Sequence, residues 1–373
     1  MISHRRSGLG RYRVWVGAIG ALAALVALLL VFVKPGGSGT GAPGDSSKPV
    51  VFNQPDRTIE IGMHIENIHQ FSMKDKVYSV EGWYWLKWPE TVQRIIKSND
   101  IPVDGIVEFT NVIEGTSADV APDSSKPKPQ SSGGRYQLFR FSGRFYVDNL
   151  DLHNSPFETI DLPVVTELRP DELSCYEGGP VACVYLKPYA TDAGTLVGQY
   201  ADINGFNEVG TQITPVVHQY NTTFGSGPRS AFGSVDFSVA YKTDPLSAFT
   251  QNLLPVLIIL AFVLVSPSLP SSMGDVRLAI PATALLTLIF TQQTYRDQIP
   301  SLSYVTFMDW IYAFAYLVSM TLFILFCWGT ARYTAVSEAD QPATAARIDR
   351  VDKSFQVTAM VGLGLTALLA LVL

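Results

Sequence analysis

Long apolar runs constrain this chain more than any other feature. Five stretches of at least 18 residues carry no more than one charged side chain each: 14–33, 248–265, 276–295, 304–328 and 355–373. An α-helix of about 20 residues crosses the hydrocarbon core of a bilayer, which is about 30 Å thick. We therefore expect a membrane protein with one span near its N-terminus and four spans at its C-terminal end.

The N-terminal run follows a basic stub. Arg5, Arg6, Arg11 and Arg13 precede it, and the positive-inside rule then places the N-terminus in the cytoplasm and the next segment outside. No Ala-x-Ala cleavage site follows the run, so residues 1–34 are expected to be a stub and an uncleaved signal anchor or transmembrane helix, with a removed signal peptide as the alternative. Residues 35–50 are rich in Gly, Ser and Pro and are expected to form a flexible linker.

Residues 51–245 have the pattern of an all-β domain. Short β-rich or alternating runs, separated by Gly, Asn, Asp and Pro, predict strands over 58–65, 77–88, 106–113, 136–147, 161–167, 211–220 and 234–241. Many short strands at this spacing predict an immunoglobulin-like sandwich. The polar stretch 115–134 is expected to be a disordered surface loop.

The charge is unevenly distributed along the chain. The formal net charge is -6, yet residues 51–250 alone contain 15 Lys and Arg against 25 Asp and Glu. An acidic domain beside a membrane would raise the local concentration of cations or respond to protons. An ordinary solvated acidic surface is the alternative.

The three cysteines are expected to have different roles. Cys175 and Cys183 flank a Gly-Gly-Pro turn in the external domain, where oxidising conditions permit a disulfide between them. Cys327 lies in an apolar run and is expected to pack among other side chains. The cysteines have no His or further Cys nearby in sequence, so no metal and no cofactor are predicted.

The second C-terminal run, 276–295, has a face that suits a water-filled pore. Helical spacing places small and hydroxylated, bulky apolar and finally acidic side chains on that face, in the order Ala279, Thr283, Leu286, Phe290, Thr294 and Asp297. Polar groups in hydrocarbon cost free energy unless they have partners. The alternative is an interior helix whose hydroxyls bond back to its own carbonyls.

The order of these elements resembles the pentameric ligand-gated ion channels, in particular their bacterial members. The resemblance covers residues 59–373 and is carried by local motifs in the right order, at 74–88, 101–112, 141–168, 242–255, 277–300, 304–313 and 338–355. It implies an extracellular sandwich followed by a four-helix transmembrane bundle (246–373) in a homopentamer. The second helix of that bundle would line the pore, with Leu286 at the hydrophobic gate.

The resemblance also implies binding and coupling residues. Amines would be held between neighbouring subunits by the aromatic rings of Trp83, Phe109 and Tyr220, although each ring could equally be a packing residue. Coupling to the pore would run through Pro156, Phe157 and Pro300, which could also merely shape turns. Protons are a second candidate agonist, with titratable groups at His64, His69, His153, His218, Glu158 and Asp151.

Cation selectivity is favoured by the acidic outer domain and by Asp297. Against it, Arg296 adjoins Asp297, and Val276 stands where cation-selective relatives have a carboxylate, with Asp275 one position further out. Arg332, Arg347, Arg350 and Lys353 would lie in the cytoplasm, and the sandwich outside the inner membrane.

Two other classes of protein are alternatives to a channel. A non-conducting, membrane-anchored ligand-binding receptor or assembly protein would have the same order of elements. An enzyme is disfavoured because the chain has no His-Glu-x-x-His, Gly-x-Ser-x-Gly or phosphate-binding glycine motif. No nucleic acid is expected as a partner.

Overall fold

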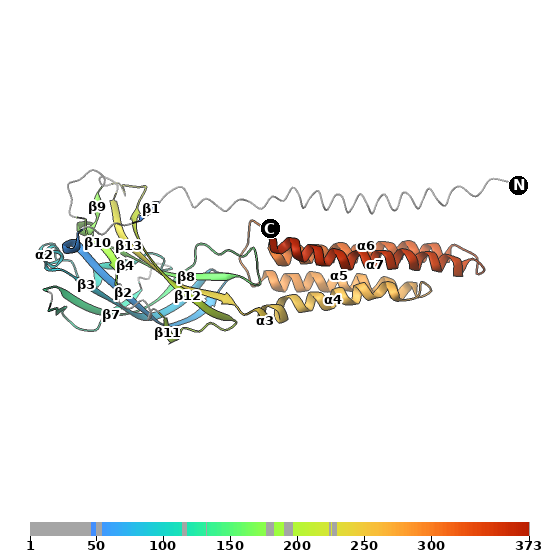
Figure 1. The fold of residues 1–373 in the computed structure, drawn as a ribbon, viewed down its shortest axis with the longest axis horizontal. Coiled ribbons are helices and arrows are strands. Elements are labelled where there is room, and N and C mark those ends of the chain that lie inside the picture. Colours follow the sequence, from blue (N-terminus) through green and yellow to red (C-terminus); the bar gives the residue numbers. More distant parts are fainter. Residues whose placement is uncertain are drawn as a thin grey trace. The chain divides into compact units, whose positions relative to one another are not determined.

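The computed structural model describes residues 46–49, 54–113, 118–131, 133–176, 183–189, 197–223, 225 and 230–372. These form a unit of β-sheets and a unit of helices (Figure 1). The apolar run 14–33, expected to be an anchor or signal peptide, lies outside the described residues. The prediction of a flexible linker is wrong for four of its residues, because Ser46–Pro49 forms strand β1. This strand pairs with the C-terminal end of β12.

The first sheet has six strands in the order β1, β12, β13, β8 and β4, with β9 also pairing with β13. The bounds of the five further strands are Phe206–Gln219 for β12, Ser230–Thr243 for β13, Thr159–Leu168 for β8, Val107–Phe109 for β4 and Cys175–Tyr176 for β9. The predicted strands within 106–113 and 161–167 fall in β4 and β8, although β4 is much shorter than expected.

The second sheet has seven strands in the order β10, β2, β3, β7 and β5, and β11 and β6 pair with β2 and β7. Their bounds are Tyr185–Pro188 for β10, Thr58–Ser72 for β2, Val77–Trp88 for β3, Arg135–Tyr146 for β7, Asp119–Pro122 for β5, Val197–Tyr200 for β11 and Lys128–Pro129 for β6. Strands β5 and β6 lie within the predicted loop 115–134, so that prediction is wrong for these residues. Helix α2 (Glu90–Ser98) follows β3.

The two sheets share an aromatic core. Tyr84 of β3 stacks on Phe139 of β7 with ring centroids 4.7 Å apart, and Phe109 of β4 stacks on Phe141 of β7 at 5.0 Å. Alternation along β3 explains this, since every second side chain points to one face of a strand. Aromatic pairs of this kind contribute about 0.5–1.5 kcal/mol beyond their burial.

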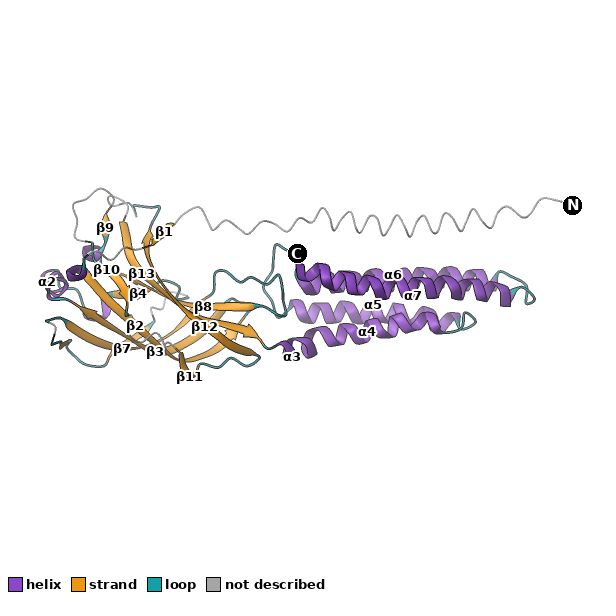
Figure 2. Cartoon of the chain, viewed as in Figure 1, coloured by secondary structure: helices purple, strands orange, loops and turns teal. Residues whose placement is uncertain are grey.

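The helical unit contains α3 (Pro245–Ala248), α4 (Leu254–Val265), α5 (Gly274–Arg296), α6 (Phe307–Thr334) and α7 (Gln341–Val372) (Figure 2). Within the described residues, three helical segments are long and apolar enough to cross a membrane, namely Pro245–Ser268, Gly274–Arg296 and Phe307–Thr334. The fourth predicted span, 355–373, falls mostly in α7, and whether it crosses a membrane stays a prediction. One buried hydrophobic cluster contains side chains from four helices, namely Val263 of α4, Ala284 of α5, Phe326 of α6 and Ala359 of α7.

Helix α5 begins earlier than the position of its proline would favour. A proline costs little free energy in the first turn of a helix, but α5 begins at Gly274 and Pro281 lies inside it. Because proline has no N–H, the carbonyl of Arg277 lacks its partner four residues on. The first turn of α5 is therefore bonded less completely than the rest.

Candidate functional site

The candidate site in the helical unit is the exposed face of α5. The opposite face of α5 is buried against neighbouring helices through Arg277, Pro281, Ala284, Leu288 and Tyr295. At about 100° per residue, these five side chains cluster around one side of the helix. The side of α5 opposite these five residues is exposed in the part of the chain that the structure describes.

All six residues predicted to line a pore lie on that exposed face. Ala279, Thr283, Leu286, Phe290, Thr294 and Asp297 are all exposed, and they fall within an arc of about 80°. Leu286 is 56% exposed and Phe290 65%. Two large apolar side chains with this much exposure would face lipid, another copy of the chain or the lumen of a pore.

The hydroxyls of α5 bond back to its own backbone. Thr287 Oγ1 donates to the carbonyl of Thr283 at 2.9 Å, and Thr294 Oγ1 donates to that of Phe290 at 3.0 Å. This is the hydrogen bonding expected for an interior helix, but Thr287 and Thr294 are exposed. The threonines therefore tolerate an apolar surrounding and still offer their oxygen lone pairs to water.

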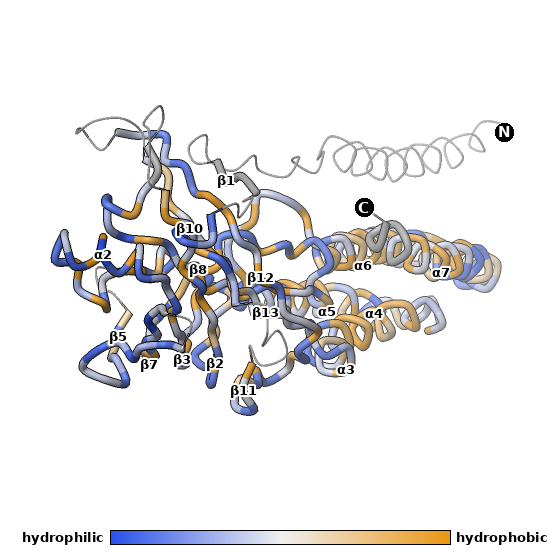
Figure 3. The backbone as a smooth tube through the Cα atoms, turned by 60° about the vertical axis from the view of Figure 1, so that its left-hand side comes forward, coloured by the Kyte–Doolittle hydropathy of each residue, from blue (hydrophilic) through white to orange (hydrophobic). Residues whose placement is uncertain are grey.

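The exposed faces of the other helices are different. On α4 the exposed side chains include Ile258, Phe262 and Val265, and on α7 they include Val357, Met360, Val361 and Leu365. In Figure 3 the tube is largely hydrophobic along α4. Such faces suit lipid, whereas the exposed face of α5 adds threonines, Gln293 and Asp297 to its apolar residues.

The start of α5 is tied to α7 by a buried ion pair. The guanidinium of Arg277 donates to Asp352, and both side chains are almost fully buried, at 3% and 0% exposed. The same guanidinium lies over the ring of Phe326 on α6, 4.3 Å from its centroid. Arg277 thus points away from the exposed face of α5.

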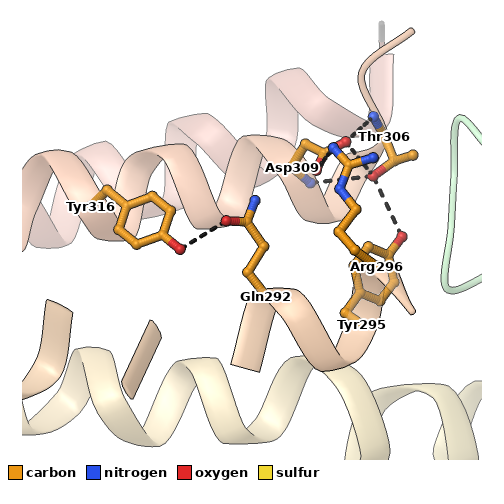
Figure 4. A network of polar contacts seen from close by, with 6 residues as sticks. All are labelled: Gln292, Tyr295, Arg296, Thr306, Asp309 and Tyr316. Carbon is orange, nitrogen blue, oxygen red and sulfur yellow. Dashed lines mark hydrogen bonds and ion pairs between the residues drawn. The ribbon is translucent and has the colours of Figure 1, made fainter. Parts of the chain in front are cut away.

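The end of α5 is tied to α6 by a second ion pair. Arg296 Nη2 lies 2.6 Å from Asp309 Oδ1, and the other oxygen of Asp309 accepts from the backbone N–H of Thr306 at 2.9 Å (Figure 4). Thr306 and Asp309 form the capping box that starts α6. One turn before Arg296, Gln292 accepts a hydrogen bond from Tyr316 at 2.8 Å.

A segment between β7 and β8 belongs to the helical unit. Leu152–Pro156 groups with the helices. The N–H of Leu152 donates to the hydroxyl of Tyr304 at 2.9 Å, and the ring of His153 stacks on Tyr304 at 3.9 Å. The carbonyl of His153 accepts from Phe307 N at 2.7 Å, at the first residue of α6.

The predicted coupling residues divide between the two units. Pro156 and Pro300 are buried in the helical unit, and Phe157 is half-buried in the β unit. Their coupling role stays a prediction. Tyr304 was missed, because nothing in the sequence marks a tyrosine 152 residues away as the acceptor for Leu152.

The three predicted aromatic ligands have different surroundings. Phe109 lies in the aromatic core, with its ring against Tyr84, Phe141 and Phe145. Trp83 is half-buried on the opposite face of β3 from Tyr84, with the guanidinium of Arg140 5.9 Å from its ring centroid. The packing interpretation therefore describes Phe109, and Trp83 lies on a different face of the sheet.

Tyr220 belongs to a half-buried polar cluster. Its hydroxyl donates to Glu167 Oε1 at 2.8 Å, and His218 Nδ1 lies 2.6 Å from Glu167 Oε2. The side chain of Glu167 is only 2% exposed. Glu108 pairs with Glu167 across β4 and β8. The pKa of Glu108 is raised by burial and by the charge of Glu167, against an opposing effect of Arg169.

A second acidic site lies in a cavity of about 380 Å³ that is lined by Asp148, Asp161 and Asp236 among other residues. Burial, with a smaller contribution from the charge of Asp161, raises the pKa of Asp236 to about 6. One oxygen of Asp236 has no hydrogen-bond partner within the described part of the chain. This carboxyl therefore titrates in mildly acidic conditions.

Two of the three cysteines have a defined state in the structure. Cys183 is disulfide-bonded and Cys327 is free. Cys327 is exposed in the described chain, so the expectation that it packs among other side chains is wrong. The side chain of Cys175, its predicted partner, lies outside the description, so the pairing stays a prediction. Within the described residues, no group of three His, Cys, Asp or Glu side chains could hold a metal ion.

Compared with known proteins, the chain matches no protein-family model and no curated protein.

Proposed function

We propose that this protein is an ion channel in which α5 from several copies lines a central pore. The observation that carries the proposal is the exposed face of α5, which combines threonines, Leu286, Phe290 and Asp297 and lies opposite the buried face of the same helix. In an isolated chain this face would meet lipid, where Asp297 and Gln293 would be costly. Around an axis, the same face meets water.

The resemblance to bacterial pentameric ligand-gated channels supplies the finer proposal. Five copies would place five Leu286 and five Phe290 side chains at successive levels of the pore. Such apolar rings close a channel by excluding water, without blocking it sterically. The β-sheets would then be an external immunoglobulin-like sandwich that binds the agonist, above a four-helix transmembrane bundle in the inner membrane.

Protons or an amine are the proposed agonists. Two carboxyls with raised pKa values, Asp236 and Glu108, favour the proton. Asp236, whose pKa is raised to about 6, changes charge as the medium becomes mildly acidic. For an amine, Trp83 and Tyr220 are the remaining candidates between neighbouring copies.

The test is to record currents from the purified full-length protein in planar bilayers while external pH is lowered from neutral. Leu286→Ala should open the apolar ring and produce current without agonist. Phe262→Ala, which truncates an apolar residue on α4 that is 70% exposed, is the matched control and should stay closed. If Leu286→Ala is silent at every pH, the protein is a non-conducting receptor or assembly protein instead.

A further inference from the structure

The charges at the two ends of α5 have different surroundings according to their sign. Helix α5 has two basic residues, Arg277 and Arg296, and each forms an ion pair with a carboxylate from another helix. Asp275 lies in the first turn of α5 and Asp297 directly follows its last residue. Both are exposed, and neither forms an ion pair within the part of the chain that the structure describes. The positive charges are compensated and the negative charges are not.

The compensating carboxylates lie on the buried side of α5. Asp352 of α7 meets Arg277, which is about 140° around the helix from the centre of the exposed face. Asp309 of α6 meets Arg296, which is only partly exposed. Asp275 and Asp297 lie on the exposed face itself, within about 60° of its centre.

We propose that Asp352 and Asp309 determine the charge selectivity of the pore by neutralising the arginines of α5. The inference rests on the proposed channel function. With both arginines compensated, each copy presents Asp275 and Asp297 as the net charges at the two mouths of the pore. The pore therefore selects cations, although an arginine lies within two residues of each of these positions in sequence.

Stability alone does not account for the Arg277–Asp352 pair. Taking two charges out of water costs several kcal/mol, and replacing such a pair with apolar side chains is often neutral or stabilising. The pair does confine the charge of Arg277 to a fixed place, and one Nε and one Oδ1 of the pair have no hydrogen-bond partner within the described residues. A role in charge placement explains why two charges lie there.

Charges of this kind have a large effect when they are repeated around an axis. Removing Asp352 would leave one uncompensated positive charge per copy near the mouth that contains Asp275. Several such charges within about one Debye length of the ion path act together on a permeant ion. We expect the cation-to-anion permeability ratio to fall roughly fivefold or more in this case.

The experiment measures the reversal potential in a KCl gradient for the full-length protein and its variants, in a Leu286→Ala background that removes the need for an agonist. The unmodified sequence in this background should prefer K⁺, and Asp352→Asn should lower the preference. Asp340→Asn is the matched control, since it removes an exposed carboxylate just before α7 that pairs with no arginine in the described structure. The double variant Arg277→Gln, Asp352→Asn should restore cation preference.

Three results would overturn the proposal: a preference for Cl⁻ in the background, an unchanged ratio in Asp352→Asn, or a double variant that stays as unselective as Asp352→Asn. If Asp352→Asn does not fold, Arg277→Gln alone decides the question, because leaving Asp352 unpaired must raise the cation preference. Absence of any current in the Leu286→Ala background would instead reject the channel function, and the proposal with it.

Discussion

The backbone N–H of Leu152 donates a hydrogen bond to the hydroxyl of Tyr304 at 2.9 Å, within the helical unit. The ring of His153 stacks on the same tyrosine with centroids 3.9 Å apart. Residues 152 and 153, between β7 and β8, are thereby fixed to the segment that precedes α6.

Tyr304→Phe tests that bond, because it removes the acceptor and keeps the ring. The cost should be about 1 kcal/mol, and the amide of Leu152 should exchange its hydrogen faster with solvent. Thermal unfolding and amide exchange of the full-length protein in detergent measure the two effects. Tyr333→Phe, which loses a hydroxyl with no described partner, should change neither. Unaltered exchange at Leu152 in Tyr304→Phe would show that the bond is not formed in solution.

Asp236→Asn should stabilise the protein at neutral pH. The pKa of Asp236 is raised to about 6, so the folded state binds a proton more tightly than the unfolded state. Its contribution is therefore most favourable below about pH 4 and is lost as pH rises through 6. Allowing for partial exposure, the ionised carboxylate costs about 2 kcal/mol at pH 7.5.

The gain from Asp236→Asn should then be about 2 kcal/mol at pH 7.5 and shrink steadily toward pH 4. Thermal unfolding over that pH range measures it. Asp119→Asn, at an exposed position on β5, controls for the general effect of removing a negative charge. A gain for Asp236→Asn that does not vary with pH would contradict the assigned shift.

Phe109→Ala should destabilise the β unit by about 2–3 kcal/mol, since it removes a half-buried ring that packs against three other aromatic rings. Trp83→Ala, on a half-buried outer face, should cost less than about 1.5 kcal/mol. Unfolding temperatures give the comparison. A fully stable Phe109→Ala would return this residue to the set of candidate ligands.

Cysteine substitution can distinguish water from lipid at the helix surfaces. In a Cys327→Ser background, Thr294→Cys should react with a charged thiol reagent at least about tenfold faster than Phe262→Cys, because the thiolate forms only where water reaches it. Labelling of the reconstituted protein, followed by mass spectrometry, measures both rates. Equal rates would mean that α5 and α4 face the same medium.

Local patterns predicted much of the fold. The apolar runs 248–265, 276–295 and 304–328 predicted the three helical segments that could span a membrane, since length and hydropathy suffice for a span. The fourth run, 355–373, predicted only the second part of α7, which begins at Gln341 in a charged stretch. Alternation also predicted long strands such as β3 and β7. The short strands β5 and β6 were missed, because a polar, proline-containing stretch gains its pairing from β7 and has no strand pattern of its own.

The candidate site was predictable only where it depends on periodicity. Spacing alone placed Thr283, Leu286 and Phe290 on one face of α5. The ion pair of Arg277 with Asp352 depends on how α5 and α7 pack, across 75 residues of sequence, and no local pattern encodes it. The same applies to Glu167, whose carboxylate contacts Tyr220 and His218, more than 50 residues away in the sequence.

Pro281 allows α5 to bend locally. The helix is held at its start by Asp352 and at its end by Asp309, and between them one rung of its hydrogen-bond ladder is missing. A helix that is fixed at both ends and lacks one backbone hydrogen bond can bend at that position while both ion pairs stay formed. Leu286 and Phe290, which both lie on the C-terminal side of Pro281, would then move together.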